Sequence, residues 1–157
     1  MPRLAGPIRP GVDRQGVAFR AARLVLSGVT TLLICSVPIA AEPAEDDRLF
    51  TDIQAARGER LYAEHCAPCH GLGLEGKGAP PLSGETFRTK WADGQHSLDD
   101  LYYIVRSSMP YSAPGKLSKQ EYVDVIAYVL KVNGYRDGEK ELPVNPTALG
   151  AITIRSR

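Results

Sequence analysis

Apolar and small residues recur at helical spacing from about residue 52 to residue 70. The positions that repeat every three or four residues are Ala55, Gly58, Tyr62 and Cys66. Positions three and four apart share one face of a helix, so the stretch predicts an amphipathic helix. Asp52 is its expected N-cap, because a short acidic side chain can accept a bond from the first free backbone N–H groups.

A second helix is predicted to start after Ser97. The run Ser97-Leu98-Asp99-Asp100 resembles a capping box, in which the serine and an acidic residue three positions later bond each other's backbone N–H groups. Leu98, Leu101, Tyr102 and Val105 then follow at helical spacing. Pro110 ends this helix, because proline has no N–H to donate and its ring clashes with the preceding turn.

A third helix is predicted to start after Ser118, where Ser118-Lys119-Gln120-Glu121 is a complete capping box. Its apolar positions are Tyr122, Val125, Ile126 and Val129, and Asn133-Gly134 ends it. No stretch before residue 135 shows sustained period-2 alternation, and residues 71–95 form a loop rich in Gly and Pro. The pattern predicts an all-α fold with three main helices.

The chain begins with a pattern typical of a secretory signal peptide. A segment rich in Arg precedes the mostly apolar run of residues 24–39, and Ala40-Ala41 offers a cleavage point. The apolar run is short for a membrane span, which needs about 20 residues. We therefore predict a signal peptide over 1–41, a flexible linker over 42–51, the main domain over 52–134 and a C-terminal tail over 135–157. A membrane anchor is expected only if the signal segment stays uncleaved.

Removal of residues 1–41 leaves 14 Lys and Arg against 17 Asp and Glu, a net charge of about −3. This balance argues against nucleic acid as a partner. Cys35 leaves with the signal segment, so only Cys66 and Cys69 remain and no disulfide framework is available. No Ser-His-Asp or paired-carboxylate constellation stands out, and we predict that the protein is not an enzyme.

Cys66-Ala67-Pro68-Cys69-His70 is the signature of covalent c-type haem attachment. Two thiols three residues apart can each add to a haem vinyl group, while the next imidazole faces the iron. A redox dithiol or half of a zinc site has the same cysteine spacing. However, the surroundings lack a βαβ pattern, and no second cysteine pair follows His70. The motif therefore predicts one haem c, bound through Cys66 and Cys69, with His70 as an iron ligand.

Met109 is the candidate for the sixth iron ligand. It is the only methionine besides Met1, and it directly follows the second predicted helix. A thioether is a soft, neutral donor that suits haem iron. A methionine can also simply fill a gap in a core, but a position at a helix exit held by proline favours ligation. His96 is the rival ligand, in a polar segment expected to be a solvated loop.

Residues 54–134 resemble the class I cytochromes c. Gly58 and Tyr62 stand eight and four residues before Cys66, where that family has residues that pack on its C-terminal helix. The run Val125-Ile126-Ala127-Tyr128 resembles the matching stretch of that helix. The resemblance implies a cytochrome c fold, with the helices and Gly/Pro-rich loops surrounding one covalently bound haem.

Three further haem contacts are implied by this resemblance. The segment Ala79-Pro80-Pro81-Leu82-Ser83-Gly84 is similar to a family loop, so the Pro80 carbonyl would accept a hydrogen bond from His70 and Leu82 would pack on the haem face. The neighbouring Pro81 is the alternative acceptor. Trp91 is a candidate hydrogen-bond donor to a haem propionate, with a role as a partly buried anchor as the alternative.

The Met-Pro-x-x-x-Pro run from Met109 to Pro114 and the tail resemble the haem domains of sulfane dehydrogenases and quinoprotein alcohol dehydrogenases. This implies a periplasmic electron carrier that takes electrons from a dehydrogenase and passes them to a terminal oxidase or another cytochrome of a respiratory chain. Two alternatives stay open at this point. One is a haem subunit held permanently in a dehydrogenase complex, and the other is a haem enzyme or gas sensor with a labile sixth ligand.

Overall fold

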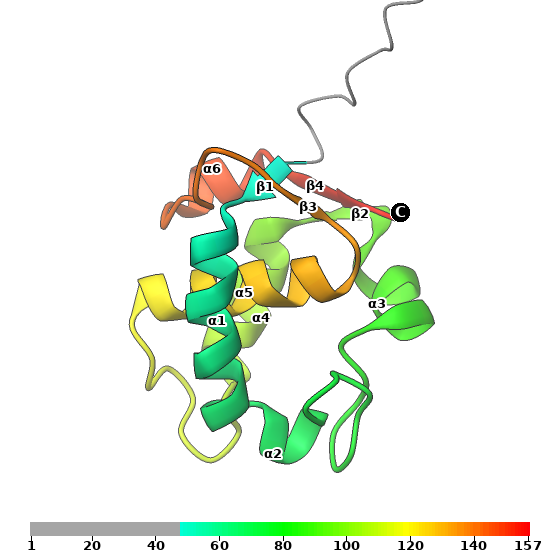
Figure 1. The fold of residues 1–157 in the computed structure, drawn as a ribbon, viewed down its shortest axis with the longest axis vertical. Helices are drawn as coiled ribbons and strands as arrows, with labels where there is room; N and C mark the ends of the chain where they lie inside the picture. The colour runs from blue at the N-terminus through cyan, green and yellow to red at the C-terminus, as the bar shows by residue number, and fades with distance from the viewer. Residues whose placement is uncertain (1–47) are drawn as a thin grey trace, which may run out of the picture. The chain divides into compact units, whose positions relative to one another are not determined.

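The computed structural model describes residues 48–157, which form six helices and four short strands (Figure 1). The predicted signal peptide, its cleavage point and the first part of the predicted linker lie outside the described residues. Within the described part of the chain, no helix is long and apolar enough to cross a membrane. In chain order the elements are β1 (Arg48–Phe50), α1 (Asp52–His65), α2 (Ala67–His70), α3 (Gly84–Trp91), β2 (Asp93–Ser97), α4 (Leu98–Ser108), α5 (Lys119–Val132), β3 (Arg136–Asp137), α6 (Pro146–Gly150) and β4 (Thr153–Arg155).

The three predicted helices are confirmed as α1 with α2, α4 and α5. Both capping boxes are present: Ser97 and Asp100 cap α4, and Ser118 and Glu121 cap α5. The first helix differs in two details. Its N-cap is Thr51 rather than Asp52, and the helix is interrupted at Cys66, after which α2 forms a separate turn that carries the end of the haem motif.

Helices α1 and α5 cross steeply, and Gly58 marks their closest approach (Figure 1). A Cβ at Gly58 would lie 1.8 Å from the backbone oxygen of Asp124, so any larger residue would force the helices apart. One turn later the rings of Tyr62 and Tyr128 pack with their centroids 5.3 Å apart. The expected packing of Gly58 and Tyr62 against the C-terminal helix is therefore confirmed.

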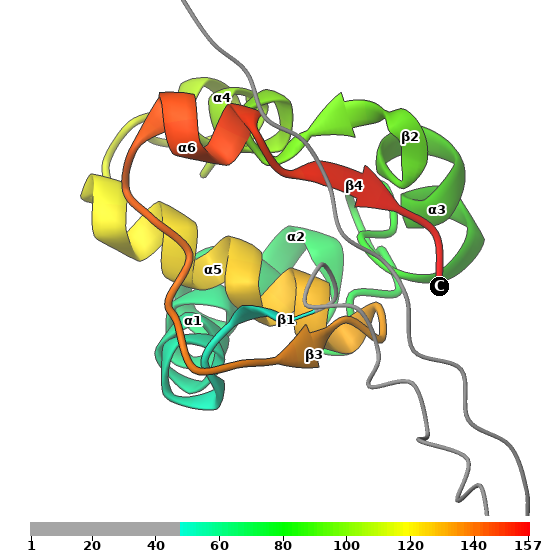
Figure 2. The same ribbon diagram turned by 90° about the horizontal axis from the view of Figure 1, so that it is seen from above.

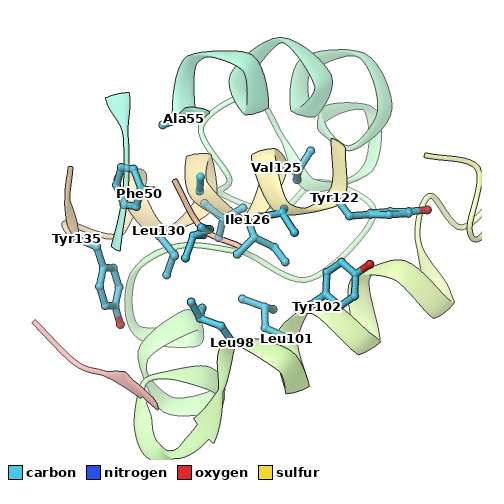
Figure 3. Close-up of a cluster of buried hydrophobic side chains, with 14 of the residues drawn as sticks. Phe50, Ala55, Leu98, Leu101, Tyr102, Tyr122, Val125, Ile126, Leu130 and Tyr135 are labelled. Carbon is cyan, nitrogen blue, oxygen red and sulfur yellow. The ribbon is translucent and has the colours of Figure 1, made fainter. Parts of the chain in front are cut away.

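The hydrophobic core lies on both sides of α5 (Figure 3). Ala55 and Val125 belong to the α1 side, and Ile126 and Leu130 face Leu98 and Leu101 of α4 on the other side. Burial of these apolar side chains provides the main driving force for folding, at about 25 cal/mol per Å² removed from water. The core thus holds α1, α4 and α5 in the fixed arrangement from which the site is built.

The segment after Gly134 folds back onto the rest of the domain. Strand β3 pairs in parallel with β1, and β4 pairs antiparallel with β2. Figure 2 shows α6 beside α4 and β4 beside β2 at the edge of the molecule. Leu142, Leu149 and Ile154 are buried, and the buried Gln54 side chain bonds both the N–H and the carbonyl of Leu142. The tail is therefore an integral part of the domain.

Three local expectations differ from the structure. Residues 84–91 form helix α3, although the sequence predicted a loop from 71 to 95. Residues 93–97, expected to be a solvated loop, form strand β2, because β4 supplies a partner from the end of the chain. The predicted flexible linker over 42–51 overlaps strand β1, where Phe50 is fully buried. The pairing partners are distant in sequence, so local patterns do not reveal them.

Candidate haem site

A mainly apolar cavity of about 430 Å³ opens among α1, α2, α3, α4 and α5. Two loops complete its wall, the segment Gly78–Leu82 and the segment Met109–Tyr111. The apolar part of the lining includes Phe87, Leu101, Val105, Val125, Ile126 and Val129. The volume falls within the range of pockets that bind small ligands and cofactors. Cys66, Cys69, His70 and Met109 all line this one cavity, although Met109 lies about forty residues after His70.

The two cysteines lie where α1 gives way to α2, and neither forms a disulfide. The N–H of Cys66 donates to the Tyr62 carbonyl, and the N–H of His70 donates to the Cys66 carbonyl. The Cys66 thiol is partly buried and the Cys69 thiol is exposed. Burial, and to a lesser extent the neighbouring Cys69, raises the pKa of Cys66 to about 11. Before haem attachment, the Cys66 sulfur is therefore a protonated thiol at neutral pH.

His70 is held in position by the loop that follows it. Its Nδ1 lies 2.8 Å from the Pro80 carbonyl oxygen, the contact that the family resemblance implied, and no such contact forms to Pro81. A carbonyl oxygen only accepts hydrogen bonds, so Nδ1 carries the proton and Nε2 keeps a free lone pair. The loop is fixed in turn by the Cys69 carbonyl, which accepts the backbone N–H groups of Gly78 and Ala79.

Leu82 and Met109 contribute to the cavity from two different loops. The Leu82 carbonyl accepts a hydrogen bond from the Asn133 side chain, which ties the loop to the end of α5. Met109 is the C-cap of α4, where its N–H donates to the Val105 carbonyl. Its own carbonyl accepts a 2.7 Å hydrogen bond from the Tyr122 hydroxyl. Helices α4 and α5 therefore both hold the backbone that carries the Met109 thioether.

The remaining candidates for haem contact, Trp91 and two histidines, differ in whether they line the cavity. Trp91 is buried, lines the cavity and packs edge-on against His96. His96 does not line the cavity; its Nδ1 lies 3.0 Å from an Asp93 carboxylate oxygen. His65, in the last turn of α1, is mostly buried and also lines the cavity. The sequence signal for a residue near the haem site was its position directly before Cys66. However, the direction of the His65 side chain depends on where α1 ends.

Comparison with known proteins agrees with this arrangement. The family model described as "Cytochrome C oxidase, cbb3-type, subunit III" matches residues 53–129. Cytochrome c-551 of Bacillus subtilis is 32% identical over 79 residues, which cover 50% of this chain and 67% of that protein. Thiosulfate dehydrogenase of Stutzerimonas stutzeri is 35% identical over 80 residues, which cover 47% of this chain but 26% of that protein.

One solved structure is also similar, the sulfane dehydrogenase SoxCD of Paracoccus pantotrophus. It has a TM-score of 0.47 and 22% identity, and the match covers 76% of this chain and 68% of that chain. By contrast, the match to thiosulfate dehydrogenase spans only about a quarter of the length of that protein.

A helical domain with a Cys-x-x-Cys-His motif beside an apolar cavity is typical of the c-type cytochromes. The match to the family model and to cytochrome c-551 shows that the chain belongs to the cytochrome c family. Membership implies a covalently bound haem c, and Cys66 and Cys69 have the spacing of its attachment motif. The donor set fits this group, because two thiols, an imidazole with a free Nε2 and a thioether line one apolar cavity.

Proposed function

We propose that the protein is a periplasmic monohaem electron carrier with His/Met axial ligation. It accepts electrons from a periplasmic dehydrogenase and passes them to a terminal oxidase or another cytochrome of a respiratory chain. The observation that carries this proposal is that His70 and Met109, distant in sequence, line the same cavity as both cysteines. A haem iron held by histidine and methionine supplies one-electron chemistry between Fe(II) and Fe(III).

Each residue has a distinct part in this proposal. Cys66 and Cys69 would hold the haem through thioether bonds, and His70 would offer Nε2 to the iron. The Pro80 carbonyl keeps the His70 proton on Nδ1, which fixes both the tautomer and the ring orientation. Met109 would supply the second protein donor to the iron, which would leave no open position for substrate or gas chemistry.

The surroundings of the cavity suit exchange of electrons with a protein partner. Tyr111 and Ile104 line the cavity and remain exposed to solvent, so apolar surface is available at its mouth. Thiosulfate dehydrogenase, one of the relatives, is named as a dehydrogenase, which supports a partner of that class. The alternative is a subunit held permanently in a dehydrogenase complex, and the tail after Gly134 is the sequence feature that supports it. That support is weakened because Leu142, Leu149 and Ile154 are buried against the tail's own domain.

The test of axial ligation is carbon monoxide binding to the reduced protein. The wild type should show a low-spin spectrum and bind carbon monoxide poorly, and its oxidised form should show a weak near-infrared sulfur-to-iron band. Met109→Ala should lose that band and bind carbon monoxide readily. Val105→Ala is the matched control, because it enlarges the same cavity without removing a donor atom and should leave the band intact.

If the wild type binds carbon monoxide as readily as Met109→Ala, the sixth position is open. The electron-carrier proposal then fails, and the alternative of a gas sensor or haem enzyme gains support.

A further inference from the structure

One side chain in the cavity wall carries a permanent charge. Among the described residues that line the cavity, Lys90 is the only lysine or arginine, and no aspartate or glutamate lines it. The other groups that can carry a charge there are the histidines His65 and His70, the cysteines and the tyrosines. Because most of the wall is apolar, the ammonium is the dominant fixed charge at this site.

Lys90 stands in the last turn of α3, directly before Trp91. Its ammonium nitrogen lies 5.3 Å from the centroid of the Trp91 ring, a cation–π arrangement. Within residues 48–157 it makes no hydrogen bond and no ion pair. The exposed Lys90 ammonium is thus oriented by an aromatic ring yet has no anionic partner among residues 48–157.

Lys90 also lines a second hollow, of about 540 Å³, on the outer side of the cavity wall. Lys90, Trp91 and Ile104 belong to both linings, so they form the boundary between the two spaces. Figure 2 shows α3 beside β2 and β4 at this edge of the molecule. The boundary is therefore one place where an amphipathic group in the cavity would reach water.

The charged groups that face Lys90 across the outer hollow come from β2 and α4. His96 is engaged by Asp93, and an Asp100 oxygen accepts bonds from the Ser97 N–H and hydroxyl. Asp99 is the other carboxylate that lines the outer hollow. These carboxylates disfavour a further anion in the outer hollow itself. An anion located on the cavity side of the boundary would avoid them and still reach the Lys90 ammonium.

A haem has an apolar ring and two propionate carboxylates, and an ionised carboxylate in an apolar environment requires a cationic or hydrogen-bonding partner. We propose that the Lys90 ammonium is the counter-ion of one haem propionate, at the boundary between the cavity and the outer hollow. In this role Lys90 orients the haem and raises its reduction potential. The proposal rests on the proposed function, since it presupposes haem in this cavity.

The sign of the effect on the potential follows from electrostatics. Oxidation of the iron adds one positive charge to the site, and a nearby ammonium opposes that addition. Replacing Lys90 by a neutral residue therefore stabilises the oxidised form and lowers the potential. With an effective dielectric constant of 20 or more over about 10 Å, the redox equilibrium constant should change roughly three- to tenfold, which corresponds to about 30–60 mV.

The experiment is an equilibrium redox titration of the holoprotein at low ionic strength. Lys90→Met should lower the potential by the amount given above, and Lys90→Arg, which keeps the charge, should restore most of it. Lys140→Met is the matched control: it makes the same change in net charge at a lysine that is exposed, as Lys90 is, but lines neither cavity. The potential of Lys140→Met should stay close to that of the wild type, because a charge outside the cavity wall is separated from the iron by more solvent and is largely screened.

Equal potentials for Lys90→Met and Lys140→Met would overturn the proposal, as would a Lys90→Arg variant that behaves like Lys90→Met. If Lys90→Met does not retain haem, Lys90→Gln is compared with Lys90→Arg by the same criterion. The low-spin spectrum and the near-infrared band are recorded for every variant. A variant that keeps both signals without a shift in potential rejects the role of Lys90 while leaving the proposed function standing.

Discussion

The close contact between α1 and α5 at Gly58 makes Gly58→Ala a severe test of the fold. An added Cβ would lie 1.8 Å from the Asp124 backbone oxygen and 2.4 Å from its carbonyl carbon. Atoms of this kind essentially never approach closer than 3.0 Å, so α1 and α5 would have to separate by about 1 Å. The obstructing atoms belong to a helix backbone and cannot rotate away as a side chain could.

The expected cost can be worked out from two opposing effects. Overpacking a well-packed core costs about 1–3 kcal/mol, and the upper end applies where backbone atoms collide. Alanine is a better helix former than glycine by about 1 kcal/mol, which offsets part of that cost. The free energy of unfolding should therefore fall by about 2 kcal/mol. For a domain of this size the melting temperature should fall by about 10 °C.

The measurement is thermal unfolding of the holoprotein, followed by far-ultraviolet circular dichroism and by haem absorption. Ala63→Gly provides the control, since Ala63 is exposed on the same helix and reports helix propensity without any collision. It should cost about 1 kcal/mol. A Gly58→Ala protein that melts at or above the wild-type temperature would refute the reasoning, because helix propensity alone would then decide the outcome.

Two further predictions concern assembly and acid stability. Cys69→Ser should leave haem poorly retained and the apo chain largely unfolded, because the apolar cavity would then lack its contents; circular dichroism of the apo protein checks this. Glu121→Gln should destabilise the protein at neutral pH but not in acid. The hydrogen bond that the Ser118 N–H donates to a Glu121 carboxylate oxygen, at 2.7 Å, lowers the pKa of Glu121 below the ordinary value for a glutamate. The glutamate's contribution is complete above that value and is lost as pH falls through the lowered pKa.

Each of these two predictions has a clear negative outcome. A fully helical apo chain that melts cooperatively would show that haem is not needed to complete the core. For Glu121, denaturant unfolding of wild type and variant is compared at pH 7 and near pH 3. A stability difference that is the same at both values would mean that the ionised carboxylate does not account for the cap. Ser118→Ala, which removes the other half of the box, should cost about 1 kcal/mol.

Local chemistry along the chain was enough to predict much of this protein. Capping boxes at Ser97 and Ser118 specified the starts of α4 and α5, because the bonds involved join residues only three apart. The Cys-x-x-Cys-His motif likewise predicted haem attachment from sequence alone, because its three functional residues lie within five positions of one another. The contact between His70 and Pro80 also followed from a short loop that the family resemblance made recognisable.

Other features depend on contacts between residues distant in sequence. Strand β2 exists because β4 pairs with it, and Phe50 is buried because β1 pairs with β3. The His65 side chain lines the cavity because of where α1 ends. The role proposed for Lys90 depends on helix α3, in a segment where the sequence predicted a loop. A sequence determines local bonds by spacing, but the direction of a side chain toward a shared cavity is determined only when the helices pack.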